Sequence, residues 1–95
     1  MGVDVQDAIR QVAALDKIVM VHFRNIRGTP NHVAEVFIDE GDEDMLQAMR
    51  TYKEAGFTGP YLLDHMPEMP APYDSWHGRA YANGSIKTLL QTVYR

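Results

Sequence analysis

The sequence contains no cysteine among its 95 residues. Disulfide bonds therefore cannot stabilise the fold, and no thiolate is present to act as a nucleophile or as a metal ligand. Any bound metal would have to be held by histidine and carboxylate side chains, which suit zinc, manganese and iron.

Long apolar runs and clustered positive charge are also missing. The longest apolar run, Ile18 to Val21, is far shorter than the ~20 residues that cross a bilayer, and residues 1–10 lack the pattern of a secretory signal. We therefore expect a soluble protein of the cytoplasm. Nine basic residues against thirteen acidic ones give a formal charge of −4. A chain with this charge lacks the clustered positive charge that attracts nucleic acids and anionic membranes, so neither is expected as a partner.

The first half of the sequence predicts a helix followed by a buried strand. Asp4 precedes apolar residues spaced three and four apart, which predicts a helix that ends near Leu15. Residues 17–23 form a β-branched apolar run without polar alternation, typical of a central parallel strand that is covered on both faces. Residues 24–30 predict a polar turn, and residues 33–38 predict either a second extended segment or part of an ordered loop.

The second half predicts a helix, a short strand and a C-terminal helix. From Asp42 the apolar residues follow the helical period, with acidic residues in the first turn and Gly56 as a stop. Gly59 and Pro60 predict a turn into a strand over residues 61–64. Strand, helix and strand at this spacing predict a right-handed βαβ unit with parallel strands. A loop over residues 66–76 and a final helix follow, so we expect the α/β class with flanking helices.

Four residues near the predicted strand ends could carry chemistry. His22 and Asp64 each fall near the carboxyl end of a predicted parallel strand, where α/β folds place ligands and catalytic groups. His65 can act as a general acid or base, since the ordinary pKa of histidine, ~6.5, lies near neutrality. Arg24 could bind a substrate carboxylate through two parallel hydrogen bonds.

Each of these residues also has a simpler interpretation. A lone histidine at a strand end is more often a hydrogen-bonded structural residue than a ligand. Asp64 could form a turn with its own backbone, and Arg24 could be solvated. We interpret six acidic residues mostly as helix caps and surface, because they lack the alternating ligands of a calcium loop. These are Glu35, Asp39, Glu40, Asp42, Glu43 and Asp44. Met45 and Met49 are interpreted as helix core.

Four segments, in this order and spacing, resemble the mannonate dehydratase family. They are Val-His-Phe-Arg-Asn at 21–25, Phe-Ile-Asp-Glu-Gly-Asp at 37–42, Asp-His at 64–65 and Gly-Arg-Ala-Tyr-Ala at 78–82. The resemblance spans nearly the whole chain. It implies that residues 1–95 form a single partial-barrel domain, the C-terminal part of a TIM-type (β/α)8 barrel of the xylose isomerase-like kind.

The resemblance also implies a reaction and a set of site residues. The family removes water from D-mannonate to give 2-keto-3-deoxy-D-gluconate, a step in hexuronate breakdown, with a divalent metal that is usually Mn²⁺ or Fe²⁺. By position, His22 and Asp64 match metal ligands, and Arg24 matches an arginine near the substrate. His65 and Tyr81 match residues assigned to proton transfer. The metal would polarise the oxygens of the sugar acid as charge grows beside its carboxylate.

The resemblance leaves the site incomplete. The remaining metal ligands of the family, a histidine and a cysteine, lie on earlier strands that this sequence lacks, and a site usually needs about three protein ligands. We expect the missing barrel portion or a homo-oligomer to complete the site and to cover open strand edges. Two alternatives remain. One is a non-catalytic truncated remnant that folds by self-association, and the other is an isomerase-like barrel protein acting on a different sugar.

Overall fold

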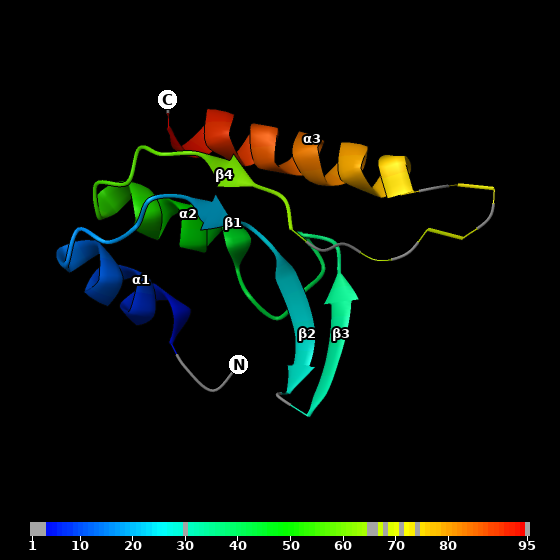
Figure 1. Cartoon of the computed structure of the whole chain (residues 1–95), viewed down its shortest axis with the longest axis horizontal. Coiled ribbons are helices and arrows are strands. Elements are labelled where there is room, and N and C mark those ends of the chain that lie inside the picture. The colour runs from blue at the N-terminus through cyan, green and yellow to red at the C-terminus, as the bar shows by residue number, and fades with distance from the viewer. Residues whose placement is uncertain are drawn as a thin grey trace.

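The computed structural model describes residues 4–29, 31–64, 67, 69–70, 72–73 and 75–94. In this part of the chain the elements are α1 (Val5–Ala14), β1 (Val21–His22), β2 (Asn25–Thr29), β3 (His32–Val36), α2 (Met45–Glu54), β4 (Tyr61–Leu62) and α3 (Ser75–Val93). β1 and β4 pair in parallel, and β2 and β3 form an antiparallel hairpin. Figure 1 shows β1 and β4 side by side with α2 behind them. The predicted α/β class with parallel strands is confirmed.

The helix ends follow local sequence signals. The Asp4 carboxylate accepts hydrogen bonds from the backbone N–H groups of Gln6 and Asp7, at 3.0 and 3.2 Å, and so caps α1. The Asp44 carboxylate caps α2 by accepting from the Gln47 N–H at 3.0 Å. After α2, Gly56 has a φ of 93°, a conformation that side chains with a Cβ rarely adopt. The predicted cap at Asp4 and the predicted stop at Gly56 are both confirmed.

A hairpin occupies the region where the sequence predicted a polar turn. β2 and β3 pair from Asn25 opposite Val36 to Thr29 opposite His32. The turn prediction for residues 24–30 was therefore wrong. The hairpin escapes recognition because residues 27–29 and 32–35 are exposed, so no buried face imposes an alternating apolar pattern on them. The prediction of an extended segment from residue 33 is confirmed as far as Val36.

The three helices cover one face of the parallel strand pair. Val21 and Phe23 are buried, at 6% and 3% exposed, and join one apolar cluster with Ile9 of α1, Met49 of α2 and Ile86 of α3. Met49 is fully buried, which confirms its interpretation as helix core. The molecule is 19 Å thick. This is close to one helix diameter of ~10 Å plus a sheet, a two-layer arrangement.

The opposite face of the strand pair is uncovered in the described part of the chain. Side chains alternate across a strand, so Met20 and His22 point away from the helices that bury Val21. Met20 is 50% exposed, and Leu62, which lies opposite His22, is 42% exposed. The predicted strand over residues 17–23 was therefore wrong in length and in cover. The strand has only two residues, and Val19, which precedes it, is 78% exposed.

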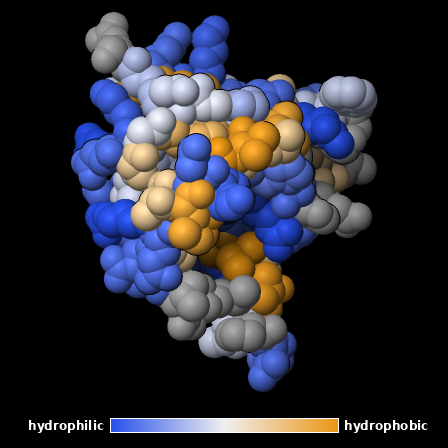
Figure 2. Space-filling model, turned by 60° about the vertical axis from the view of Figure 1, so that its left-hand side comes forward, coloured by the Kyte–Doolittle hydropathy of each residue, from blue (hydrophilic) through white to orange (hydrophobic). Residues whose placement is uncertain are grey.

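Apolar side chains also reach the surface around α1. Val12 and Leu15 are 43% and 68% exposed. Figure 2 shows apolar surface interrupted by hydrophilic residues on the side of the molecule that Figure 1 places at the left. None of the helices in the described ranges is both long enough and apolar enough to cross a membrane.

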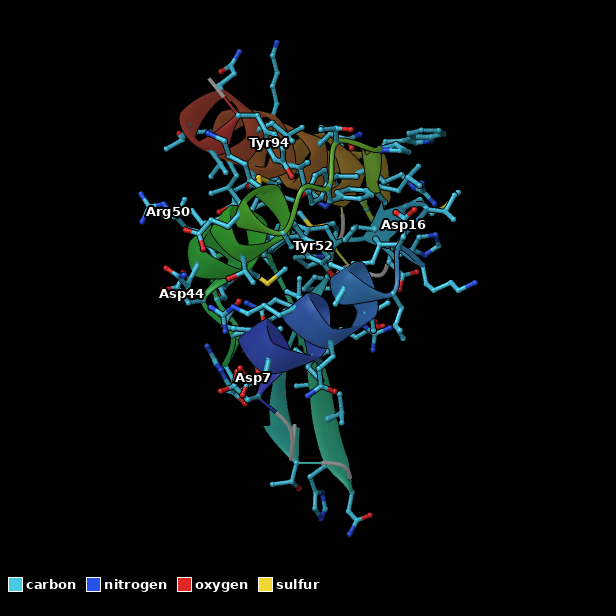
Figure 3. The ribbon with its side chains drawn as sticks, turned by 90° about the vertical axis from the view of Figure 1, so that its left-hand side faces the viewer. Asp7, Asp16, Asp44, Arg50, Tyr52 and Tyr94 are labelled. Atoms are coloured by element: carbon cyan, nitrogen blue, oxygen red, sulfur yellow. The ribbon has the colours of Figure 1, made fainter. Side chains whose placement is uncertain are left out.

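Aromatic rings attach the end of α3 to β4. The Tyr61 ring lies between 5.4 and 5.9 Å from the rings of Phe23, Tyr52, Phe57 and Tyr94. The Tyr94 hydroxyl donates to the Phe57 carbonyl at 2.9 Å, so Tyr61 donates in the 2.6 Å bond between the two hydroxyls. Figure 3 shows Tyr52 in the interior behind α1 and Tyr94 beside the end of α3.

Candidate functional site

His22 and Asp64 meet on the uncovered face of the strand pair. His22 ends β1, and Asp64 lies two residues beyond β4. The imidazole Nδ1 lies 3.9 Å from the carboxylate Oδ1, which is too long for a hydrogen bond. Two ligands that each lie ~2.1 Å from one metal are roughly 3–4 Å apart. The spacing of this pair therefore fits a shared metal ion.

Arg24 contacts the other oxygen of the same carboxylate. Its Nη1 lies 3.6 Å from Asp64 Oδ2, and both side chains are about one-third exposed, at 32% and 31%. Arg24 follows His22 by two residues, so both point to the same face of the chain. A guanidinium carries five N–H donors. One contact with Asp64 leaves donors that can bind an anionic substrate group.

The loop beside these residues is organised by the Asn25 side chain, which is 2% exposed. Its Nδ2 donates to the carbonyls of Ile38 and Glu43 at 2.9 and 3.0 Å, and its Oδ1 accepts from the Glu43 N–H at 3.3 Å. A Cβ at Gly41 would lie 2.1 Å from the Asn25 side chain, so only glycine fits there. Sequence reasoning missed the role of Asn25, although the residue stands in the segment 21–25 that carries the family resemblance.

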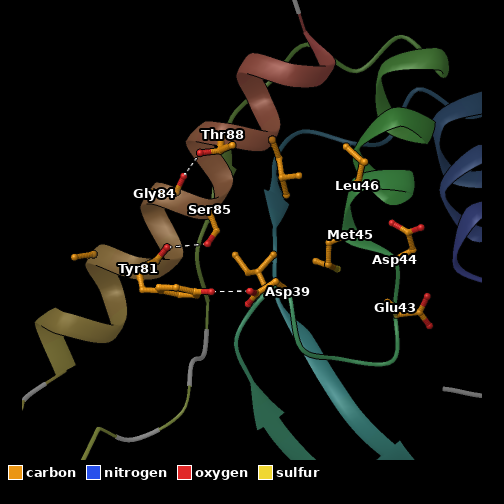
Figure 4. Close-up of a pocket in the computed structure, with 12 residues that line it drawn as sticks. Asp39, Glu43, Asp44, Met45, Leu46, Tyr81, Gly84, Ser85 and Thr88 are labelled. Carbon is orange, nitrogen blue, oxygen red and sulfur yellow. Dashed lines mark hydrogen bonds between the residues drawn. The ribbon is translucent and has the colours of Figure 1, made fainter.

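Tyr81 lies on α3 and contacts the same loop. Its hydroxyl donates to Asp39 Oδ2 at 2.6 Å (Figure 4), and its ring packs edge-on against Phe37 with the centroids 4.7 Å apart. The hydrogen bond to the Asp39 carboxylate is the main reason that the pKa of Tyr81 is raised above its ordinary value. Tyr81 is therefore a neutral phenol at pH 7. Asp39 was interpreted as a cap or surface residue, so its contact with Tyr81 was missed.

Three of the predicted site residues line two neighbouring cavities. One, of about 690 Å³, lies between α2 and α3 and is lined by Tyr81 and Asp39. The other, of about 230 Å³, is lined by His22 and Arg24. Glu43, just before α2, and Met45, its first residue, line both cavities. Tyr81 therefore lines one cavity, and His22 and Arg24 line the other, with the N-terminal end of α2 between them.

The described residues include too few metal ligands for a complete metal site. His65 lies outside the described residues, so its predicted catalytic position stays a prediction. Within the ranges that the structure describes, no group of three or more His, Cys, Asp or Glu side chains could hold a metal. His22 and Asp64 supply two ligands where about three are usual.

Comparison with known families identifies the chain. The family model for D-mannonate dehydratase (UxuA) matches residues 1–95. The chain belongs to the D-mannonate dehydratase family. This confirms the family predicted from the segments at 21–25, 37–42, 64–65 and 78–82. Membership supports a lyase of carbohydrate metabolism with a sugar acid as substrate. A search of curated proteins finds no match.

Proposed function

We propose that the chain is the C-terminal portion of a (β/α)8-barrel D-mannonate dehydratase and contributes part of its active site. The observation that carries this proposal is the convergence of His22, Arg24 and Asp64 at the carboxyl ends of two neighbouring parallel strands. Catalytic groups of such barrels lie at this end of the strands. The uncovered strand face would then be the inside of the barrel.

The proposed roles follow from the chemistry of each side chain. His22 and Asp64 hold a divalent metal, Mn²⁺ or Fe²⁺, which when bound polarises the oxygens of the sugar acid. Arg24 binds the carboxylate of D-mannonate with the donors that Asp64 leaves free. His65 and Tyr81 move the protons. One accepts the proton from the carbon beside the carboxylate, and the other protonates the departing hydroxyl, which leaves as water and yields 2-keto-3-deoxy-D-gluconate.

The remaining ligands come from outside residues 1–95 under this proposal. They are supplied by the missing barrel portion or by further copies of the chain in a homo-oligomer. The exposed Met20 and Leu62 side chains and the open edges of the β1–β4 pair favour such an assembly. Residues 1–95 then act as one partial-barrel unit.

An activity assay with matched variants tests the proposal. The chain, alone and mixed with a polypeptide that supplies the earlier barrel strands, is given D-mannonate and Mn²⁺, and formation of the 2-keto-3-deoxy acid is followed. We expect His22→Ala and Asp64→Ala each to lower kcat by more than ~100-fold, beyond the loss typical of groups that only support a ligand. His32→Ala, an exposed histidine of β3, should retain full activity. Absence of product in every mixture would contradict the proposal.

A second candidate function is a non-catalytic remnant that assembles through its strand edges. It is favoured by the shortage of metal donors in the described part of the chain. This candidate predicts self-association without Mn²⁺ binding, whereas the dehydratase predicts both in the active assembly. Measuring metal binding and oligomeric state in the same buffer separates the two.

A further inference from the structure

We propose that Asp39 is a positioning residue for Tyr81, holding the phenol hydroxyl at the wall of the cavity between α2 and α3. The proposal rests on the proposed function, because it deepens the part that Tyr81 plays there. It assigns a role to an acidic residue that sequence analysis interpreted as cap or surface.

The contact between the two side chains is short and directional. The Tyr81 hydroxyl lies 2.6 Å from Asp39 Oδ2, within the ~2.5–2.7 Å typical of a hydroxyl that donates to a charged carboxylate. The tyrosine is 46% exposed, and an exposed ring is ordinarily free to change rotamer. Here the Asp39 bond and the Phe37 ring act at two different points of the side chain. Together they fix the hydroxyl beside the cavity, where Figure 4 shows its bond to Asp39.

Asp39 itself is held in place by bonds on both sides along the chain. The Ile38 carbonyl accepts from the buried Asn25 amide at 2.9 Å. The Glu40 carbonyl accepts from the Arg27 guanidinium. Because both neighbours of Asp39 are tied to the β2 strand, its carboxylate meets Tyr81 at a fixed point. A carboxylate on a freely moving loop would lose the bond to solvent.

The charges around Tyr81 are predominantly negative. Its hydrogen bond to Asp39 raises the pKa of the phenol, followed by partial burial and by the charges of Asp39 and Glu40, while Ser85 has a lowering effect. Glu43 and Asp44 line the same cavity, and its described lining includes no basic side chain. The protonated phenol is thus the form present during turnover. The rate should fall as pH rises through the pKa of Tyr81.

Two isosteric substitutions test the proposal. Asp39→Asn removes the charge but keeps an oxygen that can accept the hydroxyl bond, and Glu40→Gln removes a neighbouring charge that makes no such bond. The pKa of Tyr81 is measured by NMR with ring-labelled tyrosine, with Tyr81→Phe used to assign its signal. The pH dependence of kcat is measured in the assembly that dehydrates D-mannonate. We expect Asp39→Asn to lower the pKa and to move the alkaline limb of kcat to lower pH by the same amount. Glu40→Gln should move both less.

Four results would overturn the proposal, and they are distinguishable. An unchanged pKa of Tyr81 in Asp39→Asn, or an equal shift in Glu40→Gln, removes the role of the hydrogen bond. A lowered pKa with an unmoved alkaline limb shows that the bond only joins α3 to the loop. Full activity of Tyr81→Phe overturns the catalytic role of Tyr81 under the proposed function, and the positioning with it, even where the pKa falls as expected.

Discussion

A single buried amide, that of Asn25 at the start of β2, connects this strand with the loop that carries Asp39. Its side chain makes three hydrogen bonds with backbone groups, one with Ile38 and two with Glu43. Burying a polar group costs free energy unless its partners are present. Asn25 is therefore a structural residue. Its role depends on the folded loop, because its hydrogen-bond partners are backbone groups of that loop.

Removing the Asn25 amide should destabilise the fold. In Asn25→Ala the backbone groups of Ile38 and Glu43 lose their partner, and we expect the free energy of unfolding to fall by about 2–3 kcal/mol. Urea denaturation followed by circular dichroism measures this change. Asn31→Ala, at an exposed asparagine in the hairpin turn, should stay within about 0.5 kcal/mol of the parent chain. Equal stabilities of the two variants would contradict the role assigned to Asn25.

Tyr61 should make stability depend on alkaline pH. Its pKa is raised, first by burial and then by its hydrogen bond with Tyr94. Because the folded-state pKa lies above the unfolded value of about 10, the contribution is fully present below pH 10 and is lost as pH rises beyond it. Urea midpoints recorded from pH 8 to 11 should be flat and then fall. The urea midpoint of Tyr61→Phe should fall less steeply above pH 10. An equally steep fall would contradict the assignment of the pH dependence to Tyr61.

At the scale of elements, two glycines with open space around them should respond in opposite ways. Gly84 lies inside α3, and Gly56 follows α2 with a φ of 93°; no atom lies within 4 Å of a Cβ added at either position. Gly84→Ala should stabilise the chain by about 0.5–1 kcal/mol, because alanine loses less backbone entropy in a helix. Gly56→Ala should destabilise it by about 1–2 kcal/mol, the cost of a left-handed conformation. Thermal unfolding of both variants checks the signs, and the same sign for both would be inconsistent with the described backbone.

The helices could be predicted from the sequence because their signals are local. Asp4 and Asp44 cap helices by bonding to N–H groups two or three residues away. The hairpin could not be predicted, because its exposed residues carry no periodic pattern. The prediction that residues 17–23 are covered on both faces was wrong for a different reason. An apolar run indicates that a strand is meant to be buried, but it does not show whether the covering layer belongs to the same chain.

The candidate site could also be predicted only in part. The positions of His22 and Asp64 at strand ends could be predicted, since parallel strands bring their carboxyl ends to one edge. The contact between Tyr81 and Asp39 joins residues 42 positions apart. No spacing rule predicts it, because it depends on how α3 packs against the loop after β3.

At the scale of the whole molecule, the chain has one covered and one uncovered face. The helices bury Val21 and Phe23, while Met20, His22 and Leu62 face outward. Apolar side chains beside polar candidate ligands are what the inner surface of a barrel would carry. The described part of the chain thus has the helix layer and the open strand face that the proposed barrel requires, with His22 on the open face and Tyr81 on α3.

A charge on the uncovered face should weaken self-association. Leu62→Lys places an ammonium group at a side chain that is 42% exposed and lies opposite His22. Sedimentation velocity should show a shift toward monomer, because assembly would bury the charge without a partner. Folding stability should change by less than about 0.5 kcal/mol. Val33→Lys, at a hairpin side chain that is 43% exposed, should leave the oligomeric state unchanged. A monomeric parent chain, or an equal effect of both variants, would contradict self-association of the chain and leave the missing barrel portion as the proposed source of the remaining ligands.

The measurement that tests the central claim most directly is Mn²⁺ binding by calorimetry, with the oligomeric state recorded in the same buffer. In the assembly that supplies the remaining ligands, the parent chain and His32→Ala should bind the metal, whereas His22→Ala and Asp64→Ala should lose most of that affinity, because each lacks one of the two ligands that lie 3.9 Å apart. Binding of undiminished strength in the His22→Ala assembly, or no binding by the complete parent assembly at millimolar Mn²⁺, would contradict the assignment of this pair as metal ligands.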